Sequence, residues 1–76
     1  MRVQYSSRVT RTRSTTEQAR IANSGRLLPQ LVAAAKHNFT GAAEIQAAVL
    51  IAWTALAGVV GWTPGMVVAV EEEIAR

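Results

Sequence analysis

The chain has no cysteine, no aspartate and a single histidine, His37. Without cysteine there can be no disulfide bridge, thiolate metal site or cysteine nucleophile. His37 has no carboxylate at helical spacing on its own predicted helix, so no histidine–carboxylate pair for acid–base catalysis is visible. The glutamates at 71–73 are consecutive and would fan around a helix axis instead of converging on a metal. We therefore predict a non-enzyme with no catalytic residue, no metal site, no cofactor and no small-molecule substrate.

Aromatic residues are also scarce, and the chain is short. The four aromatics in 76 residues are Tyr5, Phe39, Trp53 and Trp62. Half of the residues are apolar, but many of these are alanine, which buries little area. A domain of this size is close to the limit at which one core suffices. The composition therefore predicts a homo-oligomer, or a small domain that docks on a protein partner.

Positive charge is concentrated in the first third of the chain. Residues 1–26 contain six arginines and one glutamate, a net charge of +5. The whole chain has a net charge of +3, because residues 27–76 contribute −2. Such arginines can neutralise phosphates or contact an acidic protein surface. We therefore predict a nucleic-acid or acidic-partner contact through Arg2, Arg8, Arg11, Arg13, Arg20 and Arg26.

The N-terminal residues have little apolar surface to bury. Residues 1–13 are rich in Arg, Ser and Thr and are predicted to form an extended or disordered basic arm. Residues 14–76 are predicted to form a single small helical domain. The start of the chain lacks the apolar stretch of a signal peptide, so a cytoplasmic site, or an assembly formed in the cytoplasm, is expected.

Capping and helix-breaking residues divide the domain into helices. Ser14 and Glu17 fit a capping box, and Pro29 and Pro64 suit first-turn positions. Thr40 and Thr63 are predicted N-caps. These signals predict helices over about residues 15–23, 28–38, 41–61 and 64–75. The predicted fold is all-α, a small bundle of three to four short helices with the basic arm in front.

No residue from Ile45 to Val70 is charged, and both tryptophans lie in this block. The third predicted helix is therefore apolar almost all round, which is typical of a helix buried on every side. Small residues also recur there at four-residue spacing, which lets another backbone approach closely. We predict a partner or oligomer interface formed by Ile45, Val49, Ala52, Trp53, Leu56, Val59 and Trp62.

Residues 53–72 also carry an alanine, a glycine four places later, and apolar residues around both. Ala57 and Gly61 take these two positions, Thr63 starts the second helix, and the apolar positions are Leu56, Val60, Trp62, Val67 and Val70. This segment resembles the helix-turn-helix of phage-repressor-like proteins. The resemblance implies a DNA-binding transcriptional regulator as an alternative. The positions that would face the major groove carry no Arg, Lys, Asn or Gln, the residues that read base edges.

A second alternative comes from the same block, and the arm adds a comparison to the leading prediction of a protein-binding domain. The segment from Ile45 to Thr63 is just long enough to span a bilayer, which suggests a small single-span membrane protein, although Gln46, Thr54 and two glycines dilute its apolar character. A basic arm on a compact helical body also resembles, in general style, small assembly or host-interaction proteins of phages.

Overall fold

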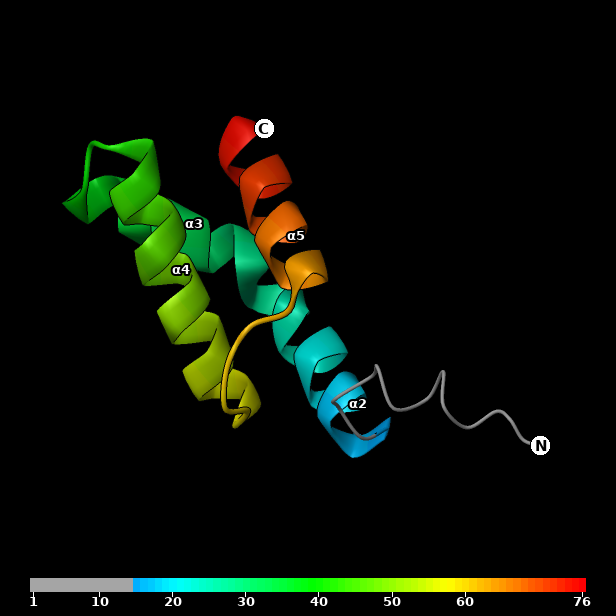
Figure 1. Ribbon diagram of the computed structural model, residues 1–76. Coiled ribbons are helices and arrows are strands. Elements are labelled where there is room, and N and C mark those ends of the chain that lie inside the picture. The colour runs from blue at the N-terminus through cyan, green and yellow to red at the C-terminus, as the bar shows by residue number, and fades with distance from the viewer. Residues whose placement is uncertain (1–14) are drawn as a thin grey trace.

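The computed structural model describes residues 15–76, and within that range it contains helices and no strand. The elements are α2 (Thr15–Ser24), a 3-10 turn η1 (Gly25–Leu27), α3 (Leu28–Asn38), α4 (Ala42–Ala57) and α5 (Pro64–Ala75) (Figure 1). The predicted all-α helical bundle is confirmed. The predicted arm over residues 1–13 and the capping residue Ser14 lie outside the described residues.

The core is built around α4, which packs against each of α2, α3 and α5. Its buried side chains come from three helices and are all apolar: Leu28, Val32 and Ala35 of α3; Ile45, Val49, Leu50, Trp53 and Ala57 of α4; Met66 and Val70 of α5. Figure 1 shows α4 and α5 as neighbouring helices, with α2 near the end of α4. The apolar stripes of α3 and α5 thus face a helix that is apolar on more than one side.

Trp53 joins α2 to α4, although α2 itself buries no residue completely. Its indole Nε1 donates to the hydroxyl of Ser24 at 2.9 Å and to the carbonyl of Ile21 at 3.2 Å. A Cβ at Gly25 would lie 3.1 Å from Cζ2 of the same indole, so a side chain there would press on the ring. Trp53 therefore explains how α2, which has few apolar residues, is held on the bundle.

The ends of α4 differ from the sequence prediction. Gly41, not Thr40, is the N-cap residue, and no side chain caps this end. At the other end the helix stops at Ala57 instead of continuing to Gly61, because Gly58 adopts a left-handed conformation with φ of 69°. Such a conformation favours glycine and closes a helix. The predicted continuous segment 45–63 is thus broken, and none of the described helices is long and apolar enough to cross a membrane.

The C-terminal end of α5 is bound by neighbouring polar side chains. Lys36 of α3 donates from Nζ to the carbonyl of Ile74 at 3.0 Å, which places a cation at the negative end of the helix dipole. Arg76 forms an ion pair with Glu73 at 3.2 Å, and Gln46 donates to Glu71 at 3.3 Å. Glu71 and Glu73 thus have compensating groups that lie outside α5.

The start of α5 provides a test of the local capping signal. The Thr63 hydroxyl accepts from the backbone N–H of Met66 at 3.3 Å, as the sequence predicted. Thr63→Ala should therefore lower the free energy of unfolding by about 1 kcal/mol in urea titrations followed by circular dichroism. Thr54→Ala is the matched control, because the Thr54 hydroxyl only bonds back to the Ile51 carbonyl within α4. An equal loss in both variants would contradict the capping role.

Candidate protein-interaction surface

The side of α4 that points away from the other helices is exposed and mostly apolar. It carries Glu44, Ala47, Ile51 and Ala55 at three- or four-residue spacing and ends at Gly58, and all five are exposed. We call these five residues the outer face of α4. Ile51 lies at the middle of this row with 62% of its surface exposed. Burying an isoleucine fully stabilises by about 1.5–3 kcal/mol, so this side chain has much to gain from a contact.

The structure separates the predicted interface residues into two groups. Ile45, Val49 and Trp53 are buried inside the chain's own core, with 6%, 1% and 5% of their surfaces exposed. These three residues therefore have almost no surface left for the predicted intermolecular contact, because α2, α3 and α5 pack on this side of α4. Leu56 and Trp62 are exposed by 55% and 51%, and Ala52 and Val59 are half-buried. Those four keep surface that a partner could contact.

Sequence reasoning missed Ile51, the one large apolar residue on the outer face of α4. Ile51 is as apolar as Val49, and the helix has no wide polar side that would mark which apolar residues face solvent. The available signal was the charge of Glu44, which lies at helical spacing from Ala47, Ile51 and Ala55. A charged residue at the start of a row argues that the row faces outward.

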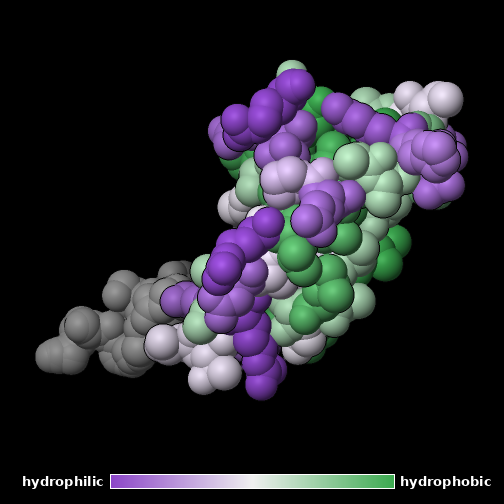
Figure 2. Space-filling view, turned by 180° about the vertical axis from the view of Figure 1, so that it is seen from behind, coloured by the Kyte–Doolittle hydropathy of each residue, from purple (hydrophilic) through white to green (hydrophobic). Residues whose placement is uncertain are grey.

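Other exposed apolar side chains lie outside α4. Val60 is 99% exposed in the connection between α4 and α5, and Val68 is 50% exposed on α5. Seen from behind the view of Figure 1, apolar side chains form a green area that extends to the edge of the molecule, whereas polar side chains gather at the top and along the other side (Figure 2). Exposed apolar side chains thus lie on the connection and on α5 as well as on α4.

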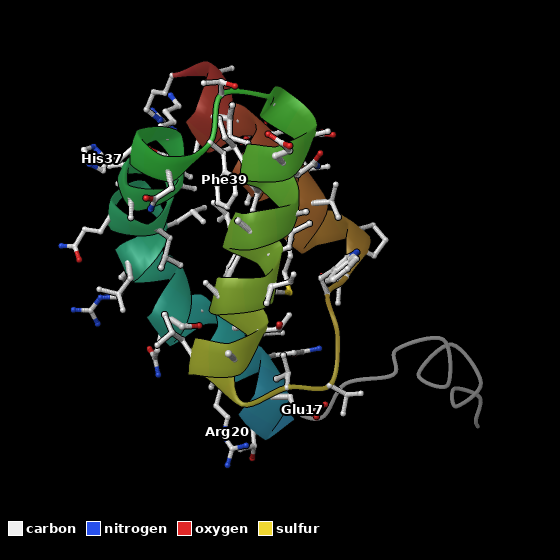
Figure 3. All side chains as sticks on the ribbon, turned by 90° about the vertical axis from the view of Figure 1, so that its left-hand side faces the viewer. Glu17, Arg20, His37 and Phe39 are labelled. Atoms are coloured by element: carbon white, nitrogen blue, oxygen red, sulfur yellow. The ribbon has the colours of Figure 1, made fainter. Side chains whose placement is uncertain are left out.

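Charged groups lie at both ends of the outer face of α4. Glu44 is at its start, and a guanidinium nitrogen of Arg20 lies 3.9 Å from the position that a Cβ at Gly58 would take. Figure 3 shows Arg20 on α2, next to the end of α4. Within residues 15–76 the ion pair between Arg76 and Glu73 is the only one, so neither Glu44 nor Arg20 has such a partner there.

The remaining candidate groups are dispersed. Arg26 is exposed on η1, and Arg2, Arg8, Arg11 and Arg13 lie outside the described residues. His37 is exposed and points away from the bundle (Figure 3). In the part of the chain that the structure describes, no three His, Cys, Asp or Glu residues are close enough to hold a metal ion. Within residues 15–76 the arrangement therefore offers surface for contact, and potential metal ligands are not gathered in one place.

The helix-turn-helix-like segment 53–72 covers the end of α4, the connection and most of α5. Gly58, and not Gly61, has a positive φ, and the connection to α5 runs from Gly58 to Thr63. Leu56, Val60 and Trp62, expected to pack the two helices together, are exposed. Comparisons with protein-family models, curated proteins and solved structures found no match. DNA binding stays a prediction, which a mobility shift of duplex DNA at low salt tests.

Proposed function

We propose that this protein is a non-enzymatic protein-binding module whose contact surface is the outer face of α4. The observation that supports this most is Ile51, exposed by 62% in a row with no charge between Glu44 and Gly58. Contiguous exposed apolar surface is typical of protein contact sites. Most of the Ile51 side chain stays in water when the monomer folds, so burying it against a partner would add a stabilisation that the monomer alone lacks.

The shape of this surface favours a helix or another flat protein element as the partner. Ala47 and Ala55 on either side of Ile51 leave the α4 backbone open to close approach. The basic arm would add contacts to an acidic partner or to nucleic acid. A compact helical body with such an arm suits a small assembly or host-interaction protein of the phage type, acting in the cytoplasm or in an assembly formed there.

A photo-crosslinker at position 51 tests this function. Ile51→p-benzoylphenylalanine in the full chain should form a covalent adduct with another protein chain on irradiation in the cells that express the protein. The same substitution at Val68, an equally aliphatic and 50% exposed residue on α5, is the control. An adduct at 51 that is absent or much weaker at 68 is the expected result. Absence of any protein adduct at 51 would refute the proposed function.

A further inference from the structure

The outer face of α4 is symmetric in position about Ile51. Ala47 precedes Ile51 by four residues and Ala55 follows it by four, whereas Glu44 and Gly58 lie seven residues away on the two sides. At about 1.5 Å rise per residue, each end lies about 10 Å from the centre. A row of this kind presents the same pattern of small and large side chains when it is read from either end.

We propose that the outer face of α4 binds the same face of a second copy of this chain, with the two α4 helices antiparallel and a two-fold axis passing by Ile51. This inference rests on the proposed function and names its partner. A two-fold interface must be self-complementary. Antiparallel pairing meets this requirement because Ile51 lies next to Ile51 of the second copy, and Ala47 lies opposite Ala55 of the second copy.

The charges at the two ends of the row select the antiparallel direction. In this arrangement Glu44 lies opposite Gly58 of the second copy, where Arg20 of that copy places its guanidinium. The contact occurs twice, and each time it joins two groups that have no ion-pair partner within residues 15–76. A parallel pair would instead place Glu44 next to Glu44. The dipoles of the two helices also oppose each other favourably when the helices are antiparallel.

The size of the contact indicates a weak, exchanging dimer. α4 has 16 residues and is about 24 Å long, and alanines allow an interaxial distance near 8 Å. One helix pair of this length buries less than the roughly 800 Å² per partner of a standard stable interface. We therefore expect a dissociation constant in the micromolar range.

Sedimentation equilibrium from about 1 µM to about 1 mM measures this association in the full chain. Wild type should pass from monomer to dimer over that range. Ile51→Lys should raise the dissociation constant by about 100-fold or more, because it removes apolar contact from both copies and places two like charges together. Val68→Lys introduces the same charge on α5 and should leave the dissociation constant within about twofold of the wild-type value. A wild type that stays monomeric throughout would overturn the proposal.

Exchanging the two charges between two variants of this chain tests the predicted contacts at the ends of the outer face of α4. Glu44→Arg alone and Arg20→Glu alone should each weaken the dimer by about 3- to 10-fold, because each brings like charges together twice. An equimolar mixture of the two variants should restore association, because both end contacts then join opposite charges. If the mixture associates no better than either variant alone, Glu44 does not face Arg20 of the second copy, and the proposed arrangement is wrong.

Single cysteines test the direction of the helices, and the absence of native cysteine makes the result unambiguous. A mixture of Ala47→Cys and Ala55→Cys should oxidise mainly to the mixed disulfide, because these positions face each other in the antiparallel pair. Homodisulfides of Ala47→Cys would indicate a parallel pair and would overturn the proposal. A monomer in solution whose position 51 crosslinks to a different protein would remove this inference while leaving the proposed function in place.

Discussion

Trp53→Ala should lower the free energy of unfolding by about 3–5 kcal/mol, enough to unfold most of the protein at 25 °C. Only 5% of the surface of Trp53 is exposed. Its indole also donates the hydrogen bond that joins α4 to Ser24 at the end of α2. Its loss leaves a large cavity, and the Ile21 carbonyl and the Ser24 hydroxyl lose a donor. A small domain has a total stability of only about 3–5 kcal/mol, so a single residue can decide the balance.

Trp62 provides the matched control, because it is the same residue type in the same block but is 51% exposed. Trp62→Ala should cost about 1 kcal/mol or less. Trp53→Phe keeps most of the packing but removes the donor, so it should fall between the two, about 1–3 kcal/mol below wild type. Urea titrations followed by circular dichroism at 222 nm measure all three. If Trp62→Ala were as unstable as Trp53→Ala, the two tryptophans would not differ in burial in the folded protein.

The helix positions could be predicted because their signals act locally. Pro64 and Thr63 determine the start of α5 within one turn, and Pro29 does the same for α3. Between the two glycines that could end α4, the structure uses Gly58, not Gly61. The β-branched Val59 and Val60 between them have low helix propensity, which is consistent with the earlier stop. The fold class therefore followed from the sequence, but the last turn of α4 did not.

The candidate surface was less predictable, because it depends on contacts between distant parts of the chain. Trp53 is buried by Ser24 and Gly25, almost 30 residues earlier, and nothing near Trp53 in the sequence indicates them. Val49 and Ile51 are two residues apart and equally apolar, yet one is 1% exposed and the other 62%. Only the placement of α2, α3 and α5 around α4 determines which of the two faces water.

That contrast leads to the second large effect. Val49→Asp should abolish the folded state at neutral pH, because an unpaired carboxylate at a 1% exposed position costs several kcal/mol on top of the lost packing. Ile51→Asp is the control on the same helix. It should change the stability of the monomer by no more than about 0.5 kcal/mol, because position 51 is 62% exposed and can keep a carboxylate in water.

The pH dependence distinguishes burial of a charge from loss of a side chain. In any residual native state, burial raises the pKa of the introduced carboxyl at position 49 above its unfolded value of about 4. The native state then binds a proton more readily than the unfolded state does. The stability deficit relative to wild type should therefore shrink as the pH falls from about 7 towards about 4. For Ile51→Asp the difference in the free energy of unfolding from wild type should stay constant over this pH range. The folded fraction measured by circular dichroism at 222 nm without urea, at several pH values, reports this recovery. A folded fraction of Val49→Asp that does not rise as the pH falls would mean that the core admits water at position 49.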